Sequence, residues 1–317
     1  MQALYFTEFG SSAVLQYGEV PLPSLQSNEV LVKNDYIGLN FADIYRRRGT
    51  YRIQEHHPYI DGYEGAGQIV QVGKAVSSSL VGQKVLYVDV PLANAEYVAV
   101  PTTKAIILPA DISPKLAATI GLQGLTADFL AHDLGNDQAG AKVFITGISG
   151  GVGQLLAQIL VADGLQVFGS ASTAAKRAVA LQNGAQGVFA SREFSWLPEQ
   201  KGQFQTVYDG VGVHLDKSLQ LLRHRGQVVF FGMAGGNPPQ IDLVQLLAES
   251  KSILTGDLWD YLTSFAERKR RSDRLFSYLR HNQIQLSEPQ VFALSAGQAA
   301  HDYLENGKNI GKVLLQP

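Results

Sequence analysis

The sequence predicts an α/β fold that combines a β-rich part with a doubly wound parallel sheet. Three observations indicate it. Residues 1 to about 110 contain short β-rich runs and no long helical period. Residues 142–163 then have the pattern of a strand, a glycine turn and a helix. From Ala141 onward, strands and helices alternate, as is typical of a parallel sheet covered by helices.

The N-terminal part consists of short strand-like runs. Val30 and Val32 alternate with Leu31 and Lys33 in a strand-like run, and β-rich runs follow at 67–72, 84–90 and 95–100. Glycine, proline and asparagine separate these runs, as expected of strands joined by turns. We therefore expect a compact, barrel-like β domain.

Within 142–163, four glycines follow a short apolar run at 143–145. Gly147, Gly150 and Gly153 have the spacing GxxGxxG, with Gly151 in addition, which differs from the usual GxGxxG. A glycine turn between a strand and a helix presents bare amides and the helix dipole to a pyrophosphate. An ordinary turn without a ligand is the alternative. A membrane span is rejected because glycines and glutamines interrupt the apolar run.

The remaining elements continue the alternation. Further strands are predicted over 165–169, 187–189, 206–209, 227–231 and 253–254, and helices over 174–183, 216–222, 243–249 and 262–280. Residues 291–317 return to strand–helix–strand character. The first domain is therefore expected to comprise both chain ends, 1–122 and 260–317, with the cofactor domain between them at 123–259.

Composition limits the possible functions. The chain has 317 residues, a net charge of −2 and no cysteine. Disulfides, thiolate nucleophiles and zinc sites built on cysteine are therefore excluded. The N-terminal residues lack the pattern of a secretory signal, so the cytoplasm is the expected compartment. The basic run 268–271 fits a solvated helix face better than a nucleic-acid patch, because the overall charge is near neutral.

The segment after the second predicted strand indicates the cofactor. NAD-binding proteins usually carry an acid there that binds the ribose 2′-hydroxyl. Here no acid occurs from Gly164 until Glu193, and Ser170, Ser172 and Lys176 stand in that segment. Hydroxyls and cations suit a 2′-phosphate, which an acid would repel. We therefore expect NADPH, with a solvent-facing Lys176 as the alternative.

Several motifs resemble one known family. They are Gly38–Tyr51, Gly62–Gly67, Gly124–Ala127, Gly147–Gly153, Tyr208–Gly212 and Gly311–Val313. Together they resemble the zinc-free, zeta-crystallin-like quinone oxidoreductases of the medium-chain dehydrogenase/reductase superfamily, over nearly the whole chain. The sequence Gly62-Tyr63-Glu64 resembles the Gly-His-Glu motif of zinc alcohol dehydrogenases with its histidine ligand lost.

The resemblance implies a GroES-like catalytic domain split around a Rossmann domain, with the active site in the cleft between them. It implies zinc-independent, NADPH-dependent reduction of a quinone or conjugated enone, no metal, and a homodimer formed through the cofactor domains. Two alternatives remain. One is a 2-enoyl thioester reductase of the same fold, and the other is a non-catalytic NADPH-binding protein with an RNA-binding or structural role.

The candidate catalytic residues lie in the first of these motifs. Negative charge develops on the substrate oxygen as hydride arrives, and neutral donors nearby would stabilise it. The resemblance points to Asn40 and Tyr51 as residues of the cleft, with Tyr45 and Asp43 behind them. Caps and packing are the alternative roles. Arg47 is expected to orient Asp43 or to contact a cofactor phosphate.

The candidate cofactor residues are spread along the cofactor domain and the C-terminal return. The amides of Gly150, Gly151 and Val152, beside Ser149, are expected at the pyrophosphate, and Ser172 and Lys176 at the 2′-phosphate. Ser191 is also expected near the adenosine phosphate, at a position where some relatives have Tyr or His. The remaining expected contacts are Thr126, Gly232, Met233, Gly256, Leu258, Asn309 and Lys312, the last two by resemblance alone.

Overall fold

The computed structural model describes residues 1–317, which form two compact units. The first unit comprises 1–122, 262–276 and 287–317, so both chain ends contribute to it. The second comprises 123–261 and 277–286. Helices α2 (Pro114–Phe129) and α8 (Phe265–Arg280) each have residues in both units.

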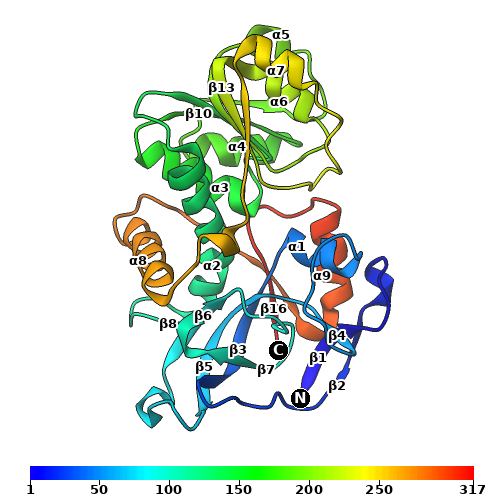
Figure 1. Ribbon diagram of the computed structural model, residues 1–317, viewed down its shortest axis with the longest axis vertical. Coiled ribbons are helices and arrows are strands. Elements are labelled where there is room, and N and C mark those ends of the chain that lie inside the picture. Colours follow the sequence, from blue (N-terminus) through cyan, green and yellow to red (C-terminus); the bar gives the residue numbers. More distant parts are fainter. The chain divides into compact units, whose positions relative to one another are not determined.

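A seven-stranded sheet organises the first unit (Figure 1). Its strands are β3 (Glu29–Leu39), β5 (Glu64–Val72), β6 (Lys84–Val88), β7 (Tyr97–Pro101), β8 (Ala105–Ile107), β15 (Gln290–Ala293) and β16 (Val313–Gln316). They follow the order β15-β16-β3-β5-β6-β8, and β7 also pairs with β3. Only β15 and β16 pair in parallel. The expected barrel-like part is this sheet, whose hydrogen-bonded path runs from β15 to β8 without closing.

Strand β3 is the centre of this sheet. Its apolar side chains are buried, and Val32 faces Ile69 of β5 and Val98 of β7 in register. These residues belong to the main core of the unit. A smaller sheet, in the order β2-β1-β4, consists of β1 (Gln2–Phe6), β2 (Gln16–Glu19) and β4 (Tyr59–Ile60).

Two further helices complete the first unit. They are α1 (Phe41–Arg47), which follows β3 directly, and α9 (Gly297–Glu305), which lies between β15 and β16. The two helices pack against each other (Figure 1). Helix α1 therefore links the central strand to the C-terminal return, and the candidate catalytic motif, 38–51, runs from the end of β3 through this helix.

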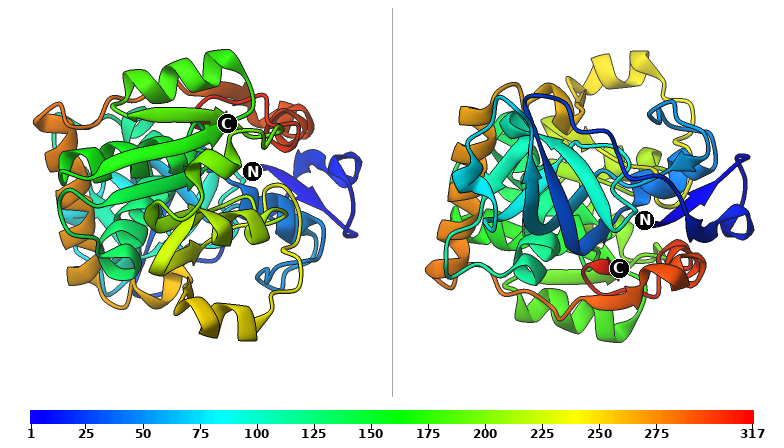
Figure 2. Two further views of the ribbon diagram at one scale, coloured as in Figure 1. Left: turned by 90° about the horizontal axis from the view of Figure 1, so that it is seen from above. Right: turned by 90° about the horizontal axis from the view of Figure 1, so that it is seen from below.

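A six-stranded parallel sheet organises the second unit, and the left view of Figure 2 shows its strands side by side. The strands are β9 (Lys142–Thr146), β10 (Gln166–Ala171), β11 (Gly187–Ala190), β12 (Phe204–Asp209), β13 (Leu222–Phe230) and β14 (Ser252–Thr255). Their order is β11-β10-β9-β12-β13-β14, and every pair is parallel. The helices are α3 (Gly151–Ala162), α4 (Ala174–Gln182), α5 (Leu197–Gln200), α6 (Leu215–Leu221) and α7 (Leu243–Glu249).

The glycine turn between β9 and α3 requires its glycines. Gly147 has φ +65°, a conformation that side chains other than glycine rarely adopt. A Cβ on Gly153 would lie 2.4 Å from the Gly147 carbonyl oxygen, and one on Gly151 would overlap the side chain of Gln123. The backbone of this turn is therefore packed so closely that a side chain at Gly153 would collide with it.

The predicted fold class is confirmed, with a GroES-like β-rich part and a Rossmann-like parallel sheet. Element ends differ by a few residues, since helix and strand ends are weakly encoded. Thr173, whose hydroxyl accepts from the Lys176 amide, caps α4, and Ser172 precedes it. No helix is both long and apolar enough to cross a membrane.

Candidate functional site

The parallel sheet of the second unit reverses its strand order between β9 and β12. From β9 the chain proceeds outward to β10 and β11, then crosses to β12, β13 and β14 on the other side. Ligands of open parallel sheets bind beyond the carboxyl ends of the strands at such a switch point. The expected cofactor residues follow these ends: Ser149 to Val152 after β9, Ser172 and Lys176 after β10, Ser191 after β11, Gly232 and Met233 after β13, and Gly256 and Leu258 after β14.

The first turn of α3 provides an anion site. Helix N-termini leave their first N–H groups without intrahelical acceptors, and here these belong to Gly151, Val152 and Gly153. The Gly150 amide instead donates to the Gly147 carbonyl at 2.9 Å, which holds the turn closed. Buried Ser149 is fixed through its carbonyl, which accepts from the Gln154 side chain at 2.9 Å. The helix dipole and these amides favour a pyrophosphate.

Two cations lie near the carboxyl ends of β10 and β11. Burial lowers the pKa of Lys176, and the charge of Arg192 lowers it further. Ser172 follows β10, and the Ser191 amide donates to the Ala171 carbonyl at 3.2 Å, which joins the two strand ends. The mutual repulsion of two cations is relieved by an anion between them. This end of the sheet therefore suits a phosphate rather than a ribose hydroxyl alone.

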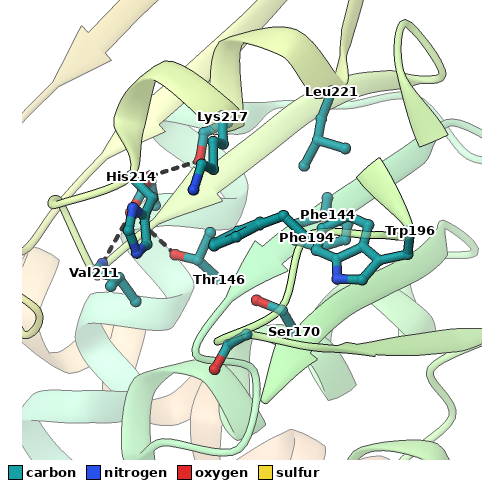
Figure 3. A pocket seen from close by; sticks show the side chains of 12 residues that line it. Phe144, Thr146, Ser170, Phe194, Trp196, Val211, His214, Lys217 and Leu221 are labelled. Carbon is teal, nitrogen blue, oxygen red and sulfur yellow. Dashed lines mark hydrogen bonds between the residues drawn. The ribbon is translucent and has the colours of Figure 1, made fainter. Parts of the chain in front are cut away.

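A pocket lies beside these strand ends, and Figure 3 shows its lining side chains. Ser170 and Ser191 line it with Phe194, His214 and Lys217. The Lys217 ammonium lies 3.4 Å from the centre of the Phe194 ring, and His214 meets that ring edge-on at 4.9 Å. The pocket therefore combines aromatic faces with hydroxyls and a cation. No periodic pattern marks Phe194, His214 or Lys217 in the sequence, because they lie in irregular or short segments.

Asp209, at the end of β12, ties the switch point together. Its side chain is buried, and Oδ1 accepts from Thr146 Oγ1 at 3.0 Å and from the amides of Val211 and Gly212 at 2.9 and 3.0 Å. Oδ2 accepts from Ser218 Oγ at 2.6 Å. One carboxylate thus joins β9, the turn after β12 and α6. The motif at 208–212 contained this residue, but its structural role was not predicted.

The loops after β12 and β13 approach each other closely. The Ala234 amide donates to the Gly210 carbonyl at 3.1 Å, and a Cβ on Gly232 would lie 3.0 Å from that same oxygen. Gly212 has φ +83°, and a Cβ there would lie 3.3 Å from the Met233 Cα. Gly232 and Met233 are therefore held against the loop that follows β12.

Gly256, Leu258 and Thr126 lie on neighbouring elements of the second unit. A Cβ on Gly256 would approach the Phe129 ring to 2.8 Å, and Phe129 lies on α2, three residues after Thr126. Leu258 is buried in a short 3₁₀ turn whose cap, Asp257, accepts from the Trp259 amide at 3.1 Å. The close contact at Gly256 fixes where β14 ends relative to α2.

In the first unit, Asn40 belongs to a buried polar triad. Its Nδ2 donates to Glu64 Oε1 at 3.0 Å, and its Oδ1 accepts from Lys312 Nζ at 3.0 Å. Lys312 also forms an ion pair with Glu64, whose Oε2 accepts from the Leu122 amide at 2.6 Å. A buried ion pair is costly unless hydrogen bonds complete it, as Asn40 and Leu122 do here. Lys312, expected at the cofactor, contacts Glu64 and Asn40 instead of solvent.

Asp43 is oriented by a different arginine from the one expected. Its Oδ1 accepts from Arg46 Nη1 at 2.9 Å, and its Oδ2 accepts from the backbone N–H of Asn40 at 2.9 Å. Burial raises the pKa of the Asp43 carboxyl, against the opposing charge of Arg46. Arg47 instead bonds to Gly10, His301 and Glu305. The prediction that Arg47 orients Asp43 is therefore wrong, because residues 46 and 47 point from α1 in different directions.

The remaining candidates of the first unit, Tyr45, Tyr51 and Asn309, have contacts of their own. The Tyr45 ring packs at 6.3 Å from that of Phe41, and the Tyr51 ring lies 5.3 Å from the Arg46 guanidinium. Both tyrosines are half-buried. Asn309 is buried, and its Nδ2 donates to the Gly311 carbonyl at 2.8 Å, which shapes the turn before β16.

The basic run on α8 is largely paired within the protein. Arg268, which is buried, bonds to Asp89 and to the Val88 carbonyl, and buried Arg271 binds Glu267. Lys269 and Arg270, the more exposed members, pair with Asp273 and Glu267. The expected solvated face thus holds for two of the four residues, while the other two pack inward. No group of three or more His, Asp or Glu side chains is placed to hold a metal ion.

Comparisons with known proteins agree with this architecture. The model for the alcohol dehydrogenase GroES-like domain matches residues 26–127, and that for the zinc-binding dehydrogenase matches 151–265. The chain is 36% identical to a probable quinone oxidoreductase of Schizosaccharomyces pombe, over 96% of this chain and 94% of that protein. It is similar to the Escherichia coli quinone oxidoreductase complexed with NADPH and to a mycobacterial protein complexed with NADPH. Each of these two structures has 31% identity, a TM-score of 0.94 and full coverage of both chains.

Proposed function

This chain belongs to the quinone oxidoreductase family of the medium-chain dehydrogenase/reductase superfamily, and we propose that it is an NADPH-dependent oxidoreductase that reduces quinones or conjugated enones. The observation that carries the cofactor is the segment after β10, where Ser172 and Lys176 stand in place of the acid of an NAD-binding protein and the charge of Arg192 lies close to Lys176. The substrate class follows from relatives named quinone oxidoreductases.

The residues of the second unit bind and orient the cofactor. The amides at the start of α3 meet the pyrophosphate, and Lys176 and Arg192, with Ser172 and Ser191, meet the 2′-phosphate. NADPH supplies the hydride, and the protein contributes binding, orientation and electrostatics. The tight turn at Gly147 and the carboxylate of Asp209 keep this surface rigid, so that little ordering is left for the moment of binding.

The residues of the first unit act on the substrate. A quinone gains negative charge on its oxygen as hydride arrives, and donors that are already ordered stabilise that charge. Asn40, Tyr51 and Tyr45 are the proposed donors. Asp43 fixes the Asn40 backbone through the bond between its Oδ2 and the Asn40 amide. Lys312 places a positive charge 3.0 Å from Asn40 Oδ1, which polarises the side-chain amide of Asn40 toward donation. Its Nδ2 donates to Glu64 Oε1 at 3.0 Å and to the Gly38 carbonyl at 3.3 Å, so a bond to the substrate oxygen replaces the longer of these two.

The test is the loss of NADPH absorbance with 1,2-quinones, 1,4-quinones and small enones as acceptors. Turnover with at least one acceptor, and a preference for NADPH over NADH, are the expected results. Absence of turnover with every acceptor, in a protein shown to bind NADPH, would contradict the proposed reaction.

We also propose that two copies associate through their cofactor domains. Strand β14 ends the parallel sheet, so its outer edge is open to another strand. Helix α7 exposes Leu243, Val244 and Leu247 by 73%, 72% and 78%. An apolar surface beside an open sheet edge is typical of an interface. A cytoplasmic location remains a proposal, which cell fractionation with immunodetection would test.

A further inference from the structure

Arg46 is a buried arginine to which the proposed chemistry gives no role. It lies on α1 and is only 1% exposed. Burying a guanidinium is costly unless its charge and its N–H groups are compensated. The groups that compensate it therefore indicate what the residue holds in place.

Four groups surround the Arg46 guanidinium. Nη1 donates to Asp43 Oδ1 at 2.9 Å, and Nε donates to the Arg52 carbonyl at 3.1 Å. The centre of the guanidinium lies 3.7 Å from the centre of the Tyr63 ring and 5.3 Å from that of Tyr51. Only arginine combines a flat face for aromatic rings with donors directed outward in the same plane.

These contacts fix an irregular segment. Residues 52–56 form no helix or strand. Arg46 contacts the Tyr51 ring and binds the Arg52 carbonyl directly, while the Tyr63 hydroxyl accepts from the Gln54 amide at 2.7 Å. The segment that carries Tyr51 is therefore held at three positions. Arg46 holds Tyr51 and Arg52, and Tyr63, whose ring lies against Arg46, holds Gln54.

The same guanidinium is linked to the other proposed donor. Asp43, which Arg46 binds, accepts from the Asn40 amide, and the Asn40 side chain joins Glu64 and Lys312. A continuous set of contacts thus runs from the buried triad through the start of α1 to Tyr51. The Arg46 side chain therefore connects the buried triad to the irregular segment that carries Tyr51.

We propose that Arg46 is a positioning residue that holds Tyr51 and Asn40 in one fixed arrangement for the substrate carbonyl. The inference rests on the proposed function, since it assigns the two donors to that reaction. Arg46 itself touches neither substrate nor cofactor. Its loss therefore misplaces the donors without removing any of them.

The main test is Arg46→Lys, which keeps the charge but loses the flat fork. A lysine can bind Asp43, yet it cannot also hold the Arg52 carbonyl and face two rings. We expect kcat with a quinone to fall about tenfold or more, because small misplacements of catalytic groups have effects of this size. The Kd for NADPH should stay within about twofold. Tyr51→Phe should cost much less in the Arg46→Lys background than in the wild type.

A second readout does not depend on activity. Glu55 is 75% exposed in the held segment, so cleavage after it by a glutamate-specific protease reports how firmly the segment is held. Arg46→Lys and Tyr63→Leu should both accelerate this cleavage, and Tyr63→Phe, which keeps the ring, should do so less. Tyr63 is only half-buried, so its variants provide the test if the Arg46 variant fails to fold.

The matched control is Arg268→Lys, a buried arginine of the same unit that donates to the Val88 carbonyl and pairs with Asp89. It should lower stability and leave both kcat and the Glu55 cleavage rate near wild type. Unchanged kcat and unchanged cleavage in Arg46→Lys would overturn the inference. An inactive wild-type protein whose Arg46 variant is cleaved faster would instead contradict the proposed function and leave the positioning contact intact.

Discussion

At the residue scale, the charges of a few side chains favour NADPH over NADH at the candidate cofactor site. The second parallel strand ends without an acid, and burial together with the nearby charge of Arg192 lowers the pKa of Lys176. A ribose 2′-hydroxyl gains nothing from this arrangement, whereas a 2′-phosphate binds two cations at once. Specificity between the two nicotinamide cofactors should therefore depend on a few side chains.

Lys176→Glu tests this assignment. Removing a charge-assisted contact and adding a repulsive charge should raise the Kd for NADPH about tenfold or more, while that for NADH stays similar or falls. Fluorescence titration of both cofactors measures the change. Lys142→Glu is the control, because this exposed lysine is the first residue of β9 and lies at the amino ends of the strands, away from their carboxyl ends. Equal NADPH affinity in Lys176→Glu and the wild type would show that the phosphate lies elsewhere.

His301 provides a pH-dependent test in the first unit. It is fully buried beside Arg47, and burial followed by that charge lowers its pKa from 6.5 to about 3. Between pH 6.5 and about 3, His301 is therefore protonated in the unfolded chain and neutral in the folded chain. Stability should fall as pH drops through this window, because ∂ΔG/∂pH follows the protons taken up on unfolding.

His301→Asn should flatten this dependence. The Asn oxygen can accept from Arg47 Nη1, as His301 Nδ1 does at 3.1 Å, but the side chain does not titrate. Urea unfolding at several pH values between 4 and 7 compares the two proteins, and all other titrating groups are common to both. The comparison requires several pH values, because the shorter side chain also lowers the free energy of unfolding by an amount that does not depend on pH. Parallel curves for the two proteins would contradict the assigned pKa.

The sequence indicated candidate residues for the site but not their contacts. Asn40, Lys312 and Lys176 were all identified in advance as candidates, and they lie in the buried triad or at the strand ends. The partners Glu64 and Arg46 were not predicted as functional. Their roles depend on which strand lies beside which helix, and spacing along one chain does not determine this.

At the element scale, the turn between β9 and α3 carries the cofactor argument. Its spacing, GxxGxxG, leaves Gly147 in a left-handed conformation and brings Gly153 against the Gly147 carbonyl. Strand, turn and helix were predictable together, because periodicity changes from strand to helix across four glycines. The short helix α1 was not predicted as an element, since seven residues give little periodicity.

Gly153→Ala tests how tight this turn must be. A Cβ there would lie 2.4 Å from the Gly147 carbonyl oxygen and 2.9 Å from the Ile148 Cα, so the backbone has to move. We expect a loss of about 1–3 kcal/mol in the free energy of unfolding and weaker NADPH binding. Gly150→Ala is the control, because its nearest contact is 3.3 Å, and it should lose less stability. Equal stability of the two variants, measured by denaturant unfolding, would contradict the close approach.

At the scale of the whole molecule, two units made from three and two chain segments divide the proposed work. The parallel sheet provides the cofactor surface, and the first unit provides the donors around Asn40 and Tyr51. The doubly wound part was predictable from alternation of strands and helices. The participation of residues 277–286 in the second unit was not, because a helix such as α8 has no local signal for the unit it joins.

Association of two copies is tested at this scale. Leu247→Glu places a charge on the most exposed apolar position of α7 and should shift the protein toward monomer in analytical ultracentrifugation. Leu181→Glu on α4, where the leucine is 48% exposed, should leave the sedimentation unchanged. A wild-type protein that sediments as a monomer, or a Leu247→Glu variant that still dimerises fully, would contradict this surface as the interface.

The central claim is hydride transfer from NADPH to a quinone, and one steady-state comparison tests it most directly. Initial rates with a 1,4-quinone are measured with NADPH and with NADH, in the wild type and in Lys176→Glu. We predict turnover in the wild type with kcat/KM at least about tenfold higher for NADPH, and loss of that preference in the variant. No turnover, or equal kcat/KM for the two cofactors in the wild type, would contradict the account.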